Sequence, residues 1–193
     1  ESYGGTWLMH TYPGIRSDSD LYTFGYRFKP WLGAPIAGAQ EILDYMGEVI
    51  EEADLAPDIR YKHKITSASF SRQTNLWTVE SERTDTGERR VFTCNFLWMC
   101  QGYYEHAHGY TPDWPGMADY KGQIVHPQTW PKDIDLKDKN VLVIGSGATT
   151  ATVVPAIAGE CKHVTVLQRS PTYFIPGRNI NELVEMLRVI GVD

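Results

Sequence analysis

Two closely spaced glycines, Gly145 and Gly147, could bring a peptide backbone against a phosphate group. They belong to the segment 145–151, which reads GSGATTA and directly follows the apolar run 140–144. Gly145 permits a tight turn, Gly147 lets the backbone approach a pyrophosphate, and Ala151, at the third glycine position, keeps the next helix close to the strand. The segment therefore predicts a dinucleotide-binding turn, and a purely structural βα turn is the alternative. The candidate contacts are Gly145, Ser146, Gly147, Ala148, Thr149, Thr150 and Ala151.

The residues after the next apolar segment indicate which nicotinamide nucleotide such a turn would bind. An NAD site has an acidic residue at the end of this strand, where it binds the ribose 2′-hydroxyl. Residues 167–171 read LQRSP and contain no carboxylate. Beside Gln168, Arg169 offers a planar cation and Ser170 a hydroxyl to a 2′-phosphate. This composition predicts NADPH as the cofactor, and an ordinary surface arginine is the alternative.

Two further residues with chemical potential are a histidine before this unit and a carboxylate near the start of the chain. His126 lies in the segment 120–131, YKGQIVHPQTWP, where a structural hydrogen-bonding histidine is the simpler interpretation. Asp18 lies in the segment 17–20, SDSD. A carboxylate beside a cation can position it and tune the local potential, but a helix cap or turn residue is an equally simple role for Asp18.

Hydrophobic patterning predicts the elements that would position these residues. Apolar residues at helical spacing predict a helix over 38–53, with an acidic outer face. The segments 63–71, 76–82 and 89–100 predict an antiparallel meander, whose last piece, 96–100, is apolar throughout, as in a strand buried on both faces. Residues 1–35 and 103–139 are expected to be mostly loop. Finally, the strand 140–144, the helix 148–159 and the strand 164–167 predict a parallel pair with a buried first strand.

Composition excludes several classes of protein. The chain of 193 residues has 42% hydrophobic and 22% charged residues, as in an ordinary globular protein. A net charge of -6 argues against nucleic-acid binding, and no apolar run approaches the roughly 20 residues that span a bilayer. Three cysteines without a C-x-x-C pair argue against a disulfide framework or metal site and favour a reducing, cytoplasmic setting. We expect Cys94 and Cys100 to be packing residues.

The segment 120–131 resembles the F-x-G-x-x-x-H-x-x-x-W-P fingerprint of the Baeyer–Villiger (class B flavoprotein) monooxygenases, with Tyr120 at the first position. The segments 4–7, GGTW, and 12–18, YPGIRSD, are similar to the flavin-side loop of that family, in particular to its ethionamide-activating branch. The likeness extends over nearly the whole chain. It implies an α/β fold, with a Rossmann-like NADP-binding domain and part of an FAD-binding domain that carries the antiparallel β-meander.

The resemblance also implies roles for individual residues. Asp18 would lie between flavin and nicotinamide, and Arg16 and Ser17 near NADP. Ile65 would contact the FAD adenine through its backbone, and His126 would have a conformational role where the nucleotide domains meet. The remaining candidate cofactor-binding residues are Thr6, Trp7, Leu8, Met9, Tyr22, Gly102 and Trp130.

The implied domains are a partial FAD-binding domain at 1–110, a linker at 111–139 and an NADP-binding domain at 140–193. The implied activity is an FAD- and NADPH-dependent insertion of one oxygen atom from O2 into a ketone, giving an ester or lactone, with sulfide oxygenation by the same oxidant. We expect the FAD pyrophosphate turn to precede Glu1 and the active-site arginine to follow Asp193, so that the chain by itself is inactive. An N-hydroxylating or other two-dinucleotide flavoprotein, and a non-catalytic NADP-binding fragment, remain as alternatives.

Overall fold

The computed structural model describes residues 2–192, so the expectations about Glu1 and Asp193 lie outside the described residues. The chain forms two compact units. One unit is built from Ile50–Glu105, and the other from Tyr3–Val49 together with His106–Asp193. No helix of residues 2–192 combines the length and the apolar character that crossing a membrane requires.

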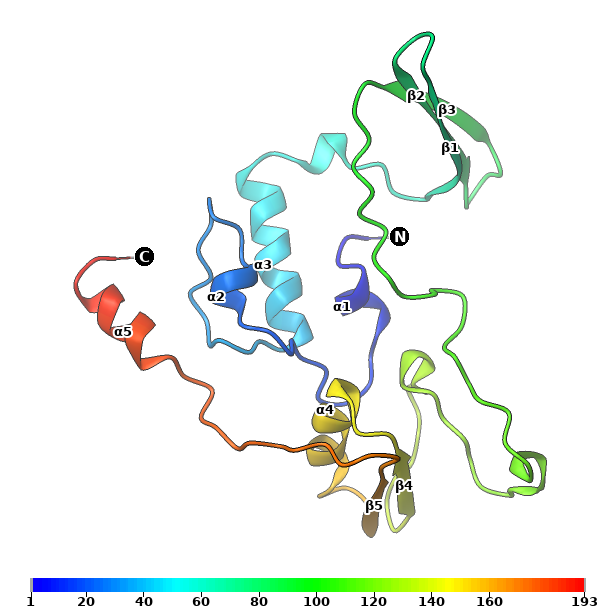
Figure 1. The fold of residues 1–193 in the computed structure, drawn as a ribbon, viewed down its shortest axis with the longest axis vertical. Coiled ribbons are helices and arrows are strands. Elements are labelled where there is room, and N and C mark those ends of the chain that lie inside the picture. The colour runs from blue at the N-terminus through cyan, green and yellow to red at the C-terminus, as the bar shows by residue number, and fades with distance from the viewer. Residues whose placement is uncertain (1, 193) are drawn as a thin grey trace. The chain divides into compact units, whose positions relative to one another are not determined.

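The first unit is an antiparallel sheet of three strands in the order β1-β2-β3 (Figure 1). The strands are β1 (His63–Ser71), β2 (Leu76–Arg83) and β3 (Arg89–Cys94). Asn75 and Gly87 have left-handed backbone conformations in the two connecting turns, at φ of 55° and 72°. Such turns join neighbouring strands directly, and they confirm the predicted meander.

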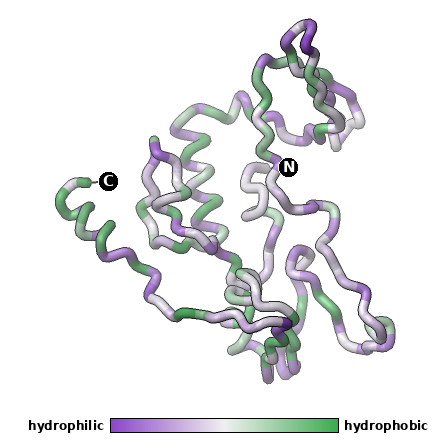
Figure 2. Tube along the Cα trace, viewed as in Figure 1, coloured by the Kyte–Doolittle hydropathy of each residue, from purple (hydrophilic) through white to green (hydrophobic). Residues whose placement is uncertain are grey.

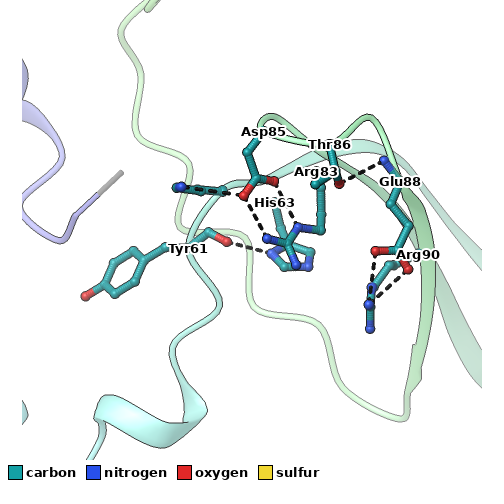
Figure 3. A network of polar contacts seen from close by, with 8 residues as sticks. Tyr61, His63, Arg83, Asp85, Thr86, Glu88 and Arg90 are labelled. Carbon is teal, nitrogen blue, oxygen red and sulfur yellow. Dashed lines mark hydrogen bonds and ion pairs between the residues drawn. The ribbon is translucent and has the colours of Figure 1, made fainter.

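A polar network holds the turn between β2 and β3 (Figure 3). Arg83 donates to both oxygens of Asp85, from Nε at 2.9 Å and Nη2 at 2.7 Å. Lys62 Nζ lies 3.5 Å from the same carboxylate, and Arg90 pairs with Glu88 at 2.9 Å. The hydrogen bonds from Arg83 hold the pKa of Asp85 well below its usual range. These groups lie in solvent and satisfy one another, so they order the turn.

The predicted buried strand over 96–100 is wrong. These residues have no strand conformation, and Phe96 and Trp98 are 76% and 78% exposed. Cys100 is also exposed, which contradicts its predicted packing role, whereas Cys94 is partly buried in β3. A strand buried on both faces needs neighbouring strands and covering layers. Within residues 2–192 no strand pairs with this segment, so its composition alone does not make it a strand.

The core of the second unit lies on α3 (Ala39–Glu52), which confirms the predicted helix. Gly38 N–H donates to Glu41 Oε2 at 2.7 Å at its start, and the apolar face packs inward. Two single-turn helices, α1 (Thr6–Met9) and α2 (Leu21–Phe24), interrupt the otherwise irregular N-terminal segment. The buried cluster consists of Leu21, Trp31, Ala37, Ile42, Tyr45 and Val49.

The second unit also contains a strand–helix–strand element of β4 (Asn140–Ile144), α4 (Ala148–Ile157) and β5 (His163–Leu167). The strands pair in parallel, from Asn140 opposite His163 to Ile144 opposite Leu167, as predicted. The prediction of a fully buried first strand is wrong, because exposed and partly buried residues alternate along both strands. Within the described chain one face of this strand pair is exposed to solvent. Hydrophobic residues nevertheless lie along both strands (Figure 2).

The remaining helical elements are short. Two single 3-10 turns, Met117–Asp119 and Pro127–Thr129, interrupt the loop that leads to β4. A third 3-10 turn, Ala56–Asp58, precedes β1 in the first unit. The final helix, α5 (Glu182–Val189), begins at Asn181, whose side chain accepts from Val184 N–H at 3.3 Å. That hydrogen bond caps the helix at its N-terminus.

Candidate functional site

The turn after β4 requires glycine at its first position. Gly145 has a φ of 124°, a backbone conformation that residues with a side chain rarely adopt. Its N–H donates to Leu167 O at 2.9 Å, which extends the pairing of β4 and β5 by one hydrogen bond. A Cβ here would lie no closer than 3.8 Å to Thr150 Oγ1, so the constraint is the backbone conformation and not space.

At position 147, neither the backbone conformation nor the neighbouring protein atoms require glycine. Its φ of -83° suits any residue, and a Cβ would meet nothing within 4 Å. Gly147 is the N-cap of α4 and offers no side-chain cap to the first turn of the helix, while the Ser146 hydroxyl accepts from Thr172 Oγ1 at 2.7 Å. The first amides of α4 are therefore open to an outside anion, and the absent side chain at 147 leaves room for its approach.

The residues after β5 lie beside this turn. Gln168 Oε1 accepts from Thr172 N–H at 3.3 Å, and Thr172 in turn bonds Ser146. Arg169 and Ser170 are exposed. No ion pair engages the Arg169 guanidinium within residues 2–192. An exposed cation thus follows the strand end at which an NAD site would carry a carboxylate.

A pocket of about 360 Å³ lies in the N-terminal half of the second unit. Small-molecule sites of about 300–1,000 Å³ with mostly apolar walls and few polar groups are usual. This pocket has such walls, and Asp18 is its one ionisable carboxylate. Its lining comes from three segments: Trp7; Ser17, Asp18, Ser19, Leu21, Phe24 and Tyr26; and Ile42, Tyr45 and Met46.

Backbone pairing fixes the residue next to Asp18. Ser17 is buried, its N–H donates to Ala37 O at 2.8 Å, and its Oγ accepts from Ala37 N–H at 3.1 Å. Asp18 itself is exposed and accepts a hydrogen bond from Ser19 Oγ at 3.1 Å. The helix cap is Asp20, whose carboxylate accepts from Tyr22 N–H at 2.8 Å. The helix-cap role therefore falls to Asp20, whereas Asp18 lines the pocket, with a turn residue as its alternative role.

The other predicted cofactor-binding residues of the N-terminal segment differ in exposure. Thr6, Trp7, Leu8 and Met9 make up α1, in which Trp7 lines the pocket and Leu8 and Met9 are exposed. Gly4 precedes them at a φ of 118°, and a Cβ there would overlap Leu43 of α3. Arg16 is exposed and forms a backbone bridge with Gly38. Tyr22 Oη donates to Gly33 O at 2.9 Å.

His126 and Trp130 lie at the two ends of a short turn. His126 Nδ1 accepts from Gln128 N–H at 3.1 Å, as the cap of the turn Pro127–Thr129, and Trp130 follows that turn. The imidazole lies on the backbone of Gly109, where a Cβ would overlap the ring. The structure thus gives His126 the hydrogen-bonding role that was the simpler interpretation. That role is compatible with the conformational one that the resemblance implies.

Ile65 and Gly102 belong to the other compact unit. Ile65 lies at a register shift in β1, next to the unpaired Thr66, and its side chain is 54% exposed. Gly102 has a φ of 75° in an exposed loop. Register shifts of this kind are over-represented next to active sites. The assignment of both residues to the FAD remains a prediction.

Sequence reasoning missed most of the pocket wall and two anchoring side chains. Ile42, Tyr45 and Met46 line the pocket from α3, where the helical apolar pattern indicates only core. Asn179 and Arg188 bind the backbone of residues 31–36. No local motif marks either residue, because their partners lie 143 to 157 positions away in the sequence.

Comparison with known proteins places these features in a family. The model of the flavin-binding monooxygenase-like family matches residues 36–182. The chain belongs to this family. It is 47% identical, over 189 residues, to the FAD-containing monooxygenase EthA of Mycobacterium tuberculosis, covering 97% of the chain and 38% of that relative. The chain therefore spans well under half the length of the curated relatives that it matches.

Solved structures give the same result for the fold. A cyclohexanone monooxygenase variant from Rhodococcus sp. Phi1 bound to NADP+ superimposes with a TM-score of 0.77 at 30% identity, over 98% of this chain and 37% of that one. A cyclohexanone-bound cyclohexanone monooxygenase gives a TM-score of 0.75 at 28% identity, over 98% and 37%. These neighbours are Baeyer–Villiger enzymes, so the resemblance stated from the sequence is confirmed, as is the α/β fold class with its antiparallel sheet.

Proposed function

We propose that this chain forms part of an FAD- and NADPH-dependent Baeyer–Villiger monooxygenase that inserts one oxygen atom of O2 into a ketone, giving an ester or lactone. The observation that carries the proposal is the open glycine turn at 145–147 beside Arg169, which is exposed and has no ion pair within residues 2–192, in a member of this flavin monooxygenase family. Bound FAD and NADPH would supply the redox chemistry. Sulfide oxygenation by the same oxidant is part of the proposal.

The residues of the turn fit the nucleotide that they would hold. The uncapped amides of α4 and the space at Gly147 suit a pyrophosphate. The free guanidinium of Arg169 and the hydroxyl of Ser170 suit the 2′-phosphate of NADPH. Ala148, Thr149, Thr150 and Ala151, in the first turn of α4, and the Gln168 side chain would complete the contact.

The flavin-side residues would orient the reacting groups. The aromatic and apolar wall formed by Trp7, Tyr26 and Tyr45 would exclude water, and Asp18 would hold a cationic group beside the nicotinamide. We assign Thr6, Leu8, Met9, Tyr22, Ile65 and Gly102 to the flavin side and Arg16 and Ser17 to the neighbourhood of NADP. His126 would act where the nucleotide domains meet, with Trp130 as a further cofactor-binding residue. The division into 1–110, 111–139 and 140–193 is part of the same proposal.

The nucleotide assignment is tested by thermal shift with NADP+ and NAD+ on the wild type, Arg169→Ala and Arg178→Ala. Because Arg169 would form charge-assisted hydrogen bonds to the 2′-phosphate, its loss should weaken NADP+ binding by about 10- to 100-fold and leave NAD+ binding unchanged. Arg178 is an equally exposed arginine nine positions later and serves as the matched control. Equal stabilisation of the wild type by both nucleotides would refute the assignment.

The reaction is tested with the flavin-loaded protein that carries this chain. Incubation with NADPH, cyclohexanone and ¹⁸O2 should give a lactone that contains one labelled oxygen, detected by mass spectrometry. Methyl phenyl sulfide and a primary amine serve as comparison substrates. Hydroxylation of the amine without lactone formation would replace the proposal by the N-hydroxylating alternative.

A further inference from the structure

The extended segment between β5 and α5 is attached at one end to the nucleotide turn and at the other end to the backbone of Ile36. Figure 1 shows it in orange, running from the end of β5 toward α5. We define residues 172–179 as the strap. Its side chains are exposed, and it contains no regular secondary structure, so its path depends on the hydrogen bonds at its two ends.

The first end of the strap is bound to the nucleotide turn. Thr172 Oγ1 donates to Ser146 Oγ at 2.7 Å, and Thr172 N–H donates to Gln168 Oε1 at 3.3 Å. Both acceptors are candidate nucleotide-binding residues. A ligand that orders Ser146 and Gln168 would therefore also order the start of the strap.

The far end is bound to the loop 31–37. The Asn179 side chain accepts from Ile36 N–H at 2.9 Å and donates to Ile36 O at 2.8 Å. Two opposed hydrogen bonds to one residue fix both the position and the direction of its backbone, as a neighbouring strand does. Arg188 reinforces the same loop, because it donates to the carbonyls of Trp31 and Leu32.

Ala37, which follows Ile36, connects the loop 31–37 to the pocket. Ala37 is fully buried and exchanges two hydrogen bonds with Ser17, at 2.8 and 3.1 Å. Ser17 directly precedes Asp18, which lines the pocket. A continuous series of hydrogen bonds and peptide bonds thus joins the glycine turn, the strap, the loop 31–37 and Asp18.

We propose that Asn179 is a positioning residue through which nucleotide bound at the glycine turn holds Asp18 in place. The Asn179 side chain bonds the backbone of Ile36 and would act on Asp18 through Ala37 and Ser17. The inference rests on the proposed function, because it takes the turn as the nucleotide site. It goes beyond that function in one respect: nucleotide binding at the turn and the order of the pocket are coupled. The strap, which contacts the turn at one end and the loop 31–37 at the other, transmits the coupling.

Hydrogen exchange of the flavin-loaded protein with and without NADP+ tests the coupling. In the wild type, NADP+ should slow exchange in the peptide covering residues 15–22, and in Asn179→Ala the exchange of this peptide should be about threefold faster or more and insensitive to NADP+. The matched control is Asn181→Ala, which removes an asparagine two positions later that caps α5. It should leave the exchange of residues 15–22 as in the wild type.

A kinetic measurement separates positioning from binding. Because Asn179 lies away from the turn, Asn179→Ala should change the dissociation constant of NADPH by less than about twofold, whereas misplacement of Asp18 should slow flavin reduction by about tenfold. Asn179→Asp keeps the acceptor for Ile36 N–H and should fall between the wild type and Asn179→Ala. If the alanine variant does not fold, the same measurements are made on Asn179→Asp.

The outcomes are distinguishable. Protection of residues 145–151 by NADP+ together with identical behaviour of residues 15–22 in the wild type and the Asn179 variants would overturn the coupling alone. Absence of protection of residues 145–151 in the wild type would overturn the proposed function, and the coupling with it. An effect of Asn181→Ala equal to that of Asn179→Ala would show that general loosening of α5 is responsible, which also overturns the role of Asn179.

Discussion

The glycine turn and the Asp18 pocket belong to the same compact unit but are built over different ranges of the sequence. The turn and the residues that contact it lie within 145–172. Both hydrogen bonds that hold it, Gly145–Leu167 and Ser146–Thr172, are formed inside this range. The pocket is lined by residues 7–46, and the loop behind it is bound by Asn179 and Arg188, 143 to 157 positions away. One site is local in sequence, and the other is a tertiary assembly.

This difference determines how each site can fail. The turn depends on the conformation of single backbone positions, so the loss of one glycine should disable it. The pocket depends on packed side chains that hold loops in place, so it should be most sensitive to the removal of a buried anchor. Substitutions of the two kinds therefore test whether the distinction is real.

Trp31→Ala should have the largest effect on stability. Trp31 is buried, packs edge-on against Tyr45 with ring centroids 5.3 Å apart, and donates to Ala34 O at 2.7 Å. Truncation of a buried tryptophan lowers the free energy of unfolding by about 3–5 kcal/mol. Urea denaturation measures the change. Trp98→Ala, at a tryptophan that is 78% exposed, is the control and should stay within about 0.5 kcal/mol of the wild type. Equal effects of the two substitutions would contradict an anchored pocket.

Alanine at the two glycines of the turn should separate folding from binding. At Gly145, where φ is 124°, alanine should destabilise the fold by about 1–3 kcal/mol. At Gly147, where a Cβ meets no protein atom within 4 Å, it should leave the melting temperature unchanged but weaken NADP+ binding, because the added methyl group occupies the space of the pyrophosphate. Thermal denaturation and NADP+ titration measure the two effects.

The reverse pattern would remove the distinction between the two glycines. If Gly147→Ala destabilised the protein and Gly145→Ala did not, the constraint on this turn would lie in packing and not in the backbone. If neither changed NADP+ affinity, the pyrophosphate contact would be elsewhere.

The local site was largely predictable from the sequence for the same reason that it is local. The strand 140–144, the start of the helix at Ala148 and the parallel pairing all follow from apolar runs and glycine spacing within one short segment. The meander and α3 were equally accessible, because alternation and helical periodicity are properties of neighbouring residues.

The remaining features depended on partners that periodicity does not report. The apolar segment 96–100 resembles a buried strand but has no strand to pair with among residues 2–192, and β4 is covered on one face only. Asn179 and Arg188 carry no motif, since their function lies in the backbone that they contact. The pocket wall from α3 had the pattern of ordinary core, because a helix face that lines a pocket and one that fills a core have the same periodicity.

The smallest expected effect concerns the pH dependence of the flavin-side region. His10 follows α1 and is 5% exposed. Burial lowers its pKa, and His106 and His126 lower it further. Since the folded-state pKa lies below the unfolded value of about 6.5, the unfolded chain binds more protons as the pH falls through that value, and the free energy of unfolding should decrease. His10→Gln should remove this part of the decrease.

Urea denaturation at pH values from about 7.5 to 5 measures the effect, over the window in which an unfolded histidine becomes charged. His163→Gln is the matched control, because it removes an exposed histidine at the start of β5, opposite Asn140 and at the other end of the strand pair from the glycine turn. If the two variants lose the same pH dependence, the effect is a general one of charge and not of burial at His10. A loss confined to His10→Gln would show that the flavin-side region carries a buried group whose protonation opposes folding.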